Sequence, residues 1–267
     1  MKDKQIIVLM GGPSEEAEVS RRTGAAIAEA LVSKGYKAQT LELNPRTVLK
    51  DIDSLGGEVV FNAIHGRYGE DGALQGLLEM AEIPYTGSGI MAHAVGMNKK
   101  VSKDVFKGAN IPTARSESYN GNLESAEAII DHIRKEFTIP VVVKSATQGS
   151  SIGVTIVREE SQLEAAVTEA LKYDPILVVE QFLDGREFTV AVLDGKALSV
   201  IEIRPHSGEY DYKSKYTVGA TEYLVPAPIS DEMTAEMQRI GELVYREVQG
   251  SGVIRVDIMT DHADKMY

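Results

Sequence analysis

The 267-residue sequence contains no cysteine, which excludes disulfides, thiol catalysis and thiolate metal sites together. Basic residues are also scarce: 28 Lys and Arg stand against 40 Asp and Glu, and the net charge of -12 argues against nucleic acid or an anionic membrane as the main partner. Long apolar runs are missing as well. The first, Ile6 to Met10, is too short for a secretory signal, and no later run could span a bilayer. We therefore expect a cytoplasmic protein with no nucleic-acid or membrane partner.

What is present is the composition of a globular protein, 43% hydrophobic and 25% charged, with enough residues for two or three packed units. Near the N-terminus, predicted strands alternate with helices, and the first helix, about Glu15–Lys34, is expected to be capped by Ser14. This order of elements predicts a Rossmann-like α/β unit. Its strands are predicted at Ile6–Met10, Ala38–Leu43 and Glu58–Ile64.

Polar residues gather where these strands end. Glu16 and Ser20 lie at the first strand-to-helix junction, a place where open α/β sheets bind ligands. His65 opens a loop, His65 to Gly72, in which three glycines alternate with an arginine and two acids, and such a loop suits ligand binding better than simple connection. Helix-end electrostatics and a structural histidine are the alternative explanations for these residues.

A dinucleotide pattern, G-x-G-x-x-A, occurs from Gly87 to Ala92. That pattern belongs after the first strand of a βαβ unit, with an acid that ends the second strand about 20 residues later. Here it follows a very short predicted strand, Pro84–Thr86, and Asp104 lies in a helical pattern. A nicotinamide site is therefore the least favoured hypothesis.

The most informative stretch runs from Pro140 to Val154. A β-branched run brings in Lys144, a loop of small and hydroxyl residues follows, and a second apolar run begins at Ile152, which predicts a strand, a loop and a returning strand. The amides of Gly149, Ser150 and Ser151 could form an anion-binding nest beside the lysine. It is not a Walker loop, because the lysine precedes the glycines. An ordinary hairpin with a surface lysine is the alternative.

Further along, a helix to Tyr173 is expected to be capped by Ser161, and a buried strand from Ile176 ends in Glu180, whose carboxylate could accept hydrogen bonds from an adenine or a ribose. A long polar connection, Pro205 to Gly219, carries three tyrosines and favours a lid. A helix capped by Ser230 follows.

The last predicted strand, Ile254–Met259, presents Arg255 and Asp257 on one face, which suggests either a surface salt bridge or a site for metal and oxyanion chemistry.

Taken together and in order, these motifs resemble the D-alanine:D-alanine ligases of the ATP-grasp superfamily over essentially the whole chain. The motifs are Gly11-Gly12-x-Ser14-x-Glu16-x-Glu18-Val19-Ser20, His65-Gly66-x-x-Gly69-Glu70-Asp71-Gly72, Tyr85-Thr86-Gly87-Ser88-Gly89, Met97-x-Lys99, Lys144 with Gly149-Ser150-Ser151-x-Gly153, Glu187-Phe188-Thr189-Val190, Tyr210-Asp211-Tyr212-x-x-Lys215-Tyr216 and Arg255-x-Asp257.

The resemblance implies an α/β protein in which a Rossmann-like N-terminal domain, residues 1–98, precedes a two-lobed ATP-grasp fold, with a central lobe at 99–184 and a C-terminal lobe at 185–267 that carries the lid. It also implies a reaction in which ATP phosphorylates the carboxylate of one D-alanine and the amine of a second attacks the acyl phosphate. The dipeptide enters peptidoglycan precursors. ATP and Mg²⁺ or Mn²⁺ are the implied cofactors, and a homodimer is the implied assembly.

The resemblance also implies a role for each matching residue. Phosphates of ATP would be contacted by Lys99 and Lys144, with Ser150 and Ser151 closing over them. Adenine and ribose would be held by Glu180, Gln181, Phe182, Leu183 and Glu187. The first D-alanine would be bound by Glu16, with Ser20 and His65 near the substrates and with Ser150 and Tyr216 linking the lid to it. The reacting groups would be met by Lys215 at the transferred phosphate, Arg255 at the tetrahedral oxyanion and Asp257 at magnesium.

These roles fit the chemistry, because phosphoryl transfer needs cations at the developing charge and an acyl phosphate survives only when water is excluded. Tyr216 favours D-alanine as the second substrate, since ligases that make the D-lactate ester depart from tyrosine there.

One departure concerns the C-terminus. The family continues beyond the Asp257 strand into a second metal-binding strand with Glu-x-Asn, a Pro-Gly turn and a substrate-contacting serine, whereas this sequence stops at Tyr267 after a turn flanked by Asp261 and Asp264. We expect the sequence to be a fragment of such a ligase. The alternatives are a D-alanine:D-lactate or other ATP-grasp ligase, and a nucleotide-binding protein without catalysis.

Overall fold

The computed structural model describes residues 1–208 and 210–267, so Glu209 of the predicted lid lies outside the described residues. The chain divides into two compact units, the first made of Met1–Met97 with Gln249–Gly252 and the second of Asn98–Val248 with Val253–Tyr267. Across the described ranges, no helix combines the length and the apolarity needed to cross a membrane.

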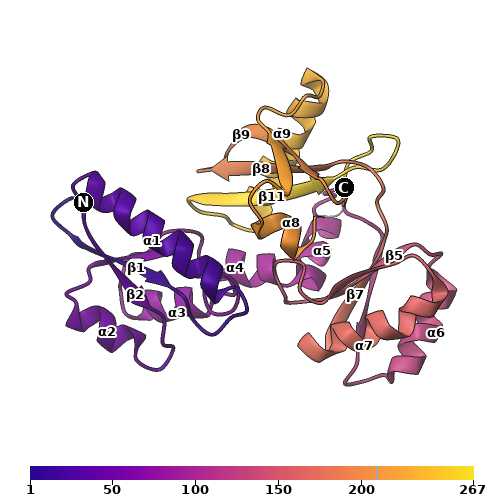
Figure 1. The fold of residues 1–267 in the computed structure, drawn as a ribbon, viewed down its shortest axis with the longest axis horizontal. Coiled ribbons are helices and arrows are strands. Elements are labelled where there is room, and N and C mark those ends of the chain that lie inside the picture. Colours follow the sequence, from indigo (N-terminus) through magenta and orange to yellow (C-terminus); the bar gives the residue numbers. More distant parts are fainter. Residues whose placement is uncertain (209) are drawn as a thin grey trace. The chain divides into compact units, whose positions relative to one another are not determined.

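The first unit contains a parallel sheet with the strand order β2-β1-β3 (Figure 1). Ile7 and Leu9 of the central strand belong to one hydrophobic cluster, and Ile6 and Val8 belong to another. Because both faces of β1 are covered, its sequence is an uninterrupted apolar run. The predicted Rossmann-like order is confirmed, with β1 (Gln5–Met10), β2 (Lys37–Glu42) and β3 (Val59–Asn62).

Helices separate these strands and follow them. They are α1 (Ala17–Ser33), α2 (Val48–Ser54), α3 (Ala73–Met80) and α4 (Ile90–Met97). The strand predicted at Pro84–Thr86 is reduced to a single bridge between Tyr85 and Val60. The glycine pattern from Gly87 therefore does not follow the first strand of the sheet, and Asp104 lies on a helix, where it pairs with Lys100 at 2.8 Å. Neither feature meets the requirements of a nicotinamide site.

The second unit begins with α5 (Lys99–Gly108) and contains two antiparallel sheets. The first has the order β4-β7-β5-β6 and encloses a core with the helices α6 and α7. Its strands are β4 (Ser116–Asn120), β5 (Val141–Ser145), β6 (Val154–Val157) and β7 (Ile176–Gln181), and its helices are α6 (Ala126–Glu136) and α7 (Leu163–Tyr173), the latter preceded by the 3-10 turn η1 (Glu160–Gln162).

The other sheet has the order β10-β9-β8-β11, and α9 packs against its central strands (Figure 1). A Cβ atom at Gly241 of α9 would lie only 3.2 Å from Val192 and 3.3 Å from Val190, so glycine lets the helix approach the sheet closely. The elements are β8 (Glu187–Leu193), β9 (Lys196–Pro205), α8 (Tyr212–Tyr216), β10 (Thr221–Leu224), α9 (Asp231–Glu247) and β11 (Val253–Met259). The polar connection predicted as a lid thus contains the short helix α8.

Two predicted helix caps are wrong. The N-cap of α1 is Glu16, and the Ser14 hydroxyl lies before the helix, where it accepts from the amide of Glu16 at 3.3 Å and donates to the carbonyl oxygen of His65 at 2.7 Å. Ser161 lies inside η1, where Glu159 and Gln162 form a capping box. The helix thus begins two residues later than predicted in the first case, and in the second a capping box of chain neighbours starts the turn two residues earlier. The Ser230 cap of α9 is confirmed, since its hydroxyl accepts from the amide of Met233.

Candidate functional site

Lys144 lies on the half-buried face of β5. Strand neighbours Val143 and Ser145 point into the core on the other face, which aims the lysine at the face where Glu180 of β7 projects. Lys144 Nζ lies 2.5 Å from Glu180 Oε2, and 23% of the Lys144 side chain is exposed. The predicted strand, loop and returning strand are confirmed. Lys144 belongs to a partly buried cluster of charges and is not an ordinary surface lysine of a hairpin.

Lys99 is fixed beside the end of the same strand. Its amide donates to the carbonyl oxygen of Ala146, and its ammonium donates to the carbonyl oxygens of Ser145 at 3.1 Å and Gln148 at 2.5 Å. Burial, and then the nearby charge of Lys144, lower the pKa of Lys99 to about 8. Two lysines from separate elements therefore lie close together.

Lys103, one helical turn after Lys99, was missed by the sequence analysis. Its Nζ lies 3.1 Å from Glu180 Oε1, and it also donates to the hydroxyl of Thr113 at 2.8 Å and the carbonyl oxygen of Ala114 at 3.1 Å. Burial lowers the pKa of Lys103, although Glu180 opposes this effect. The available signal was the i, i+4 spacing of Lys99 and Lys103, which places both on one face of α5.

Glu180 is held between the two lysines. Burial alone would raise the pKa of this carboxyl, but Lys144 and Lys103 outweigh burial and hold the pKa below its ordinary value. Beyond Glu180, the amide of Gln181 donates to the carbonyl oxygen of Arg115, the ring of Phe182 lies 4.9 Å from the guanidinium of Arg158, and Leu183 is buried. Consecutive predicted site residues thus form a continuous edge at the end of β7.

The loop between β5 and β6 meets the segment around α8. The hydroxyls of Ser150 and Tyr216 lie 2.6 Å apart, and the hydroxyl of Ser151 donates to the carbonyl oxygen of Tyr210 at 3.2 Å. Ser150 and Ser151 both have positive φ, at 50° and 62°, so this part of the loop is strongly turned. The structure therefore brings together the predicted loop and the predicted lid.

Strands β8 and β11 bring a third group of charges into the same unit. Asp257 accepts from the hydroxyl of Thr189 at 2.8 Å and pairs with Arg255 at 3.0 Å, and both charged side chains are largely exposed. Glu187 begins the neighbouring strand. Burial and then the charge of Asp257 raise the pKa of Glu187 to about 7, against the opposing effects of cations that include Lys215.

No group of three or more metal-ligating side chains occurs within the described ranges. Asp257 nevertheless offers a hard carboxylate oxygen, and its negative charge helps to raise the pKa of Glu187. A carboxylate suits Mg²⁺ or Mn²⁺ when phosphate oxygens complete the coordination.

In the first unit, Glu16 and His65 lie near each other at the ends of β1 and β3. A Cβ atom at Gly66 would lie 2.9 Å from Glu16 Oε2, and His65 Nδ1 lies 4.0 Å from Glu70 Oε1. Ser20 is fully buried: its hydroxyl accepts from the amide of Gly11 at 2.8 Å and donates to the carbonyl oxygen of Ala63 at 2.6 Å. Its hydroxyl therefore joins the ends of two strands.

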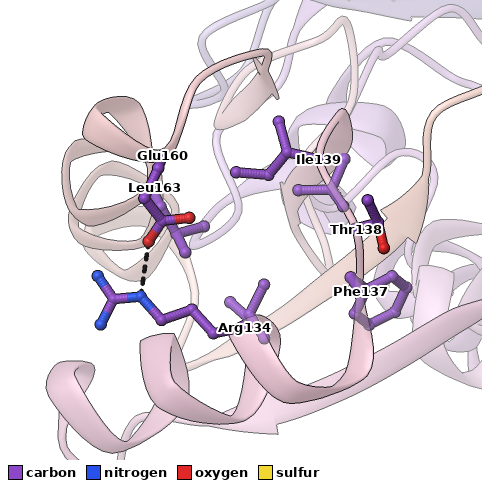
Figure 2. A pocket seen from close by; sticks show the side chains of 8 residues that line it. Arg134, Phe137, Thr138, Ile139, Glu160 and Leu163 are labelled. Carbon is purple, nitrogen blue, oxygen red and sulfur yellow. Dashed lines mark hydrogen bonds and ion pairs between the residues drawn. The ribbon is translucent and has the colours of Figure 1, made fainter.

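A separate pocket of about 330 Å³ lies beside α6, and Figure 2 shows the ion pair of Arg134 and Glu160 at its edge, 2.6 Å apart. Ile133, Phe137 and Leu163 make much of its lining apolar. None of the site residues predicted from the sequence lines it.

Comparisons with known proteins bear on the family and the fold of the chain. Family models described as D-ala D-ala ligase N-terminus and C-terminus match residues 37–88 and 105–267. The D-alanine–D-alanine ligase of Geotalea uraniireducens is 42% identical over 267 residues, which are 100% of this chain and 84% of that protein.

Solved structures of D-alanine–D-alanine ligase from Bacillus anthracis have the same fold. One has a TM-score of 0.83 and is 30% identical; the matched region covers 97% of this chain and 83% of the B. anthracis chain. Another, complexed with ATP, has a TM-score of 0.82 and is 27% identical; the matched region covers 99% of this chain and 84% of that chain.

Proposed function

The chain belongs to the D-alanine–D-alanine ligase family, a family of ATP-dependent ligases with an α/β ATP-grasp fold, and from this we propose that it joins two D-alanine molecules through a D-alanyl phosphate intermediate. Chemically, the proposal rests most on the cluster in which Lys99, Lys103 and Lys144 surround Glu180 in a chain of net charge -12. A protein this acidic gathers and partly buries ammonium groups at a cost that an anionic ligand would offset. The product would supply peptidoglycan precursors.

Lys99 and Lys144 are the proposed contacts to the phosphates of ATP. The edge at the end of β7, Glu180 to Leu183, together with Glu187 would hold adenine and ribose. Ser151 and Ser150 would order the loop over the phosphates, supported by the bonds of that loop to Tyr210 and Tyr216.

Asp257 is the proposed ligand of Mg²⁺ or Mn²⁺, with Glu187 beside it. When bound, such an ion neutralises charge on the phosphates. The charge of Asp257 contributes to the raised pKa of Glu187, so a cation bound at Asp257 would reduce that repulsion while Glu187 holds the ribose.

For the amino acids, Glu16 is the proposed partner of the first ammonium group and His65 a neighbour of the substrates. Ser20 would act indirectly, by holding Gly11 and the end of β3 in place.

In the first step a D-alanine carboxylate oxygen attacks the γ-phosphorus and ADP leaves, with Lys215 at the transferred phosphate. In the second, the amine of the other D-alanine attacks the acyl carbon, Arg255 stabilises the tetrahedral oxyanion, and phosphate leaves as the amide forms. Closure of the β5–β6 loop, which the hydrogen bond between Ser150 and Tyr216 joins to α8, would keep water from the acyl phosphate.

The test is D-alanine-dependent phosphate release from ATP and Mg²⁺, with the product identified by mass. We expect D-alanyl-D-alanine in a one-to-one ratio with phosphate and no product from L-alanine. An ester formed preferentially from added D-lactate would replace the proposal with a D-alanine:D-lactate ligase. ATP binding without turnover would replace it with a nucleotide-binding protein.

We propose that residues 1–98, 99–184 and 185–267 act as three domains, since each range contains one of the sheets of the described chain. We also propose a homodimer, to be checked by light scattering of the protein in solution.

A further inference from the structure

Glu180 forms ion pairs with two lysines that approach it from different elements. Oε2 faces Lys144 of β5 at 2.5 Å and Oε1 faces Lys103 of α5 at 3.1 Å. Glu180 and Lys103 are nearly inaccessible, with 10% and 11% of their side chains exposed, whereas Lys144 is more open at 23%. Lys144 is therefore accessible to a ligand, whereas Lys103 is not.

The contacts of Lys103 separate the two lysines further. Its ammonium has three acceptors, namely Glu180, the hydroxyl of Thr113 and the carbonyl oxygen of Ala114, which is the full number of donors that a lysine possesses. Lys103 is therefore held by the protein itself. Lys144 has the same carboxylate as a partner but also keeps an exposed part.

The charges at this point decide what the arrangement can do. A pair consisting of Lys144 and Glu180 alone has no net charge, so its attraction for a phosphate would be small. With Lys103 included, the group carries one net positive charge. If Lys144 turns toward a phosphate, Glu180 keeps a partner, and no buried carboxylate is left uncompensated.

We propose that Lys103 is a positioning residue for nucleotide binding: it neutralises and fixes Glu180, so that the positive charge of Lys144 is available to the phosphates of ATP. This inference rests on the proposed function, in which Lys144 contacts those phosphates. Lys103 itself touches no ligand in this mechanism.

The variant Lys103→Met tests the idea, because it removes the charge while keeping a long side chain. In the variant, Lys144 must serve both Glu180 and the phosphates, so we expect ATP to bind roughly 10- to 100-fold more weakly. When Lys144 engages ATP, Glu180 is left with the more distant charge of Lys99 and takes up a proton from solvent. Binding by the variant is therefore coupled to more proton uptake than binding by the wild type, in which Lys99 and Glu187 are the other groups that exchange protons near neutral pH.

The experiment is titration calorimetry of ATP with Mg²⁺ at neutral pH, in two buffers of different ionisation enthalpy. A buffer-dependent enthalpy that is larger in Lys103→Met than in the wild type supports the inference. Lys103→Arg keeps the charge and is expected to restore both the affinity and the proton uptake to near the wild-type values. Lys100→Met, on the exposed side of the same helix, is expected to bind like the wild type.

Two further variants separate positioning from loss of structure. Thr113→Val weakens the support of Lys103 without changing any charge, so it should lower the melting temperature while the proton uptake on binding stays at the wild-type value. The double variant Lys103→Met/Glu180→Gln lacks the buried carboxylate. We expect Lys103→Met to weaken ATP binding far less in the Glu180→Gln background than in the wild-type background. An equal cost in both backgrounds would overturn the inference, as would unchanged affinity in a folded Lys103→Met. Wild-type protein that binds no ATP would instead refute the proposed function.

Discussion

Lys99 is a residue whose loss of charge we expect to limit nucleotide use above neutral pH. Its ammonium is buried against the carbonyl oxygens of Ser145 and Gln148, and its pKa is lowered to about 8, mainly by burial. The charged groups around it come from several elements: Lys144 and Lys215 favour loss of its proton, whereas Glu180 and Asp174 oppose it. Below pH 8 the lysine is charged, and above that pH an increasing fraction is neutral.

We therefore expect kcat/KM for ATP to fall as the pH rises through about 8, because a neutral amine no longer attracts phosphate. At saturating ATP the bound phosphates favour the charged amine, so the fall in kcat should move to higher pH. Initial rates measured across this range check the prediction. Lys99→Arg does not titrate there and should give a flatter profile of kcat/KM.

Lys100→Arg is the control, since Lys100 is an exposed neighbour on the same helix that pairs with Asp104. Its profile should match that of the wild type. If the fall above pH 8 persists unchanged in Lys99→Arg, it belongs to another group.

Between elements, the contact of the β5–β6 loop with the α8 segment depends on few bonds. Tyr216→Phe removes the hydroxyl that lies 2.6 Å from Ser150 and leaves the ring in place. If this bond helps to exclude water, the variant should hydrolyse part of its acyl phosphate, so that phosphate is released in excess over dipeptide. The ratio of phosphate to D-alanyl-D-alanine measures this leak directly.

Tyr245→Phe in α9 is a suitable control because it removes a phenolic hydroxyl outside the loop and the lid. Its product ratio should remain at one. A ratio of one in Tyr216→Phe as well would mean that this bond does not contribute to closure.

A second contact between elements, on β8 and β9, concerns stability. Glu202 is 2% exposed and accepts from Nε and Nη2 of both Arg186 and Arg204 at 2.6 to 2.9 Å. Hydrogen bonds from Arg186, and to a smaller extent Arg204, lower the pKa of Glu202 below its ordinary value despite burial. The network joins the residue immediately before β8 to the adjacent strand.

Glu202→Gln should lower the free energy of unfolding at neutral pH by roughly 1–3 kcal/mol, because two guanidinium groups lose their carboxylate. Since the folded pKa is below the unfolded one, the contribution is complete above the unfolded pKa and is lost as the pH falls through the folded pKa. Urea unfolding at neutral and at acid pH should therefore show a difference between wild type and variant that shrinks in acid.

Glu236→Gln provides the comparison, because Glu236 forms an exposed pair with Arg239 in α9 and such pairs contribute little. If Glu202→Gln lowers the free energy of unfolding no more than Glu236→Gln does, the network contributes no more to stability than a surface ion pair.

At the scale of the molecule, the sequence was most informative where a pattern is local. Strand β1 could be predicted from its apolar run and the start of α9 from Ser230, since both depend on neighbours in the chain. The position of Lys144 on a strand that leads into a glycine-containing loop could be predicted for the same reason.

Contacts between distant residues could not be predicted in this way. Ser14 donates to the carbonyl oxygen of His65, 51 residues away, and α1 begins two residues later than the sequence suggested, with Glu16 at its N-cap. Lys103 looked like an ordinary helix lysine, because its partner Glu180 comes from a strand far along the chain. Such pairings depend on packing that no local pattern contains.

The division of the described chain into two units leads to the last prediction. Lys99, Lys144, Glu180 and Glu187 all belong to the second unit, whereas Glu16 and His65 belong to the first. A non-hydrolysable ATP analogue with Mg²⁺ should therefore slow hydrogen exchange in β5, β7, α8 and the start of α5, and leave β1, β2 and β3 unchanged. Exchange measured by mass spectrometry on peptides from each element provides the test.

The phosphates can be separated from the base by repeating the measurement with AMP, which should protect the end of β7 but have a weaker effect on the loop after Lys144. Protection of the Gly11–Ser14 turn by the analogue alone would contradict the assignment, because it would place the phosphates at the glycines that follow β1. Protection confined to the second unit would mean that the burial of Lys99 and the pairing of Lys144 with Glu180 prepare a nucleotide site before any amino acid binds.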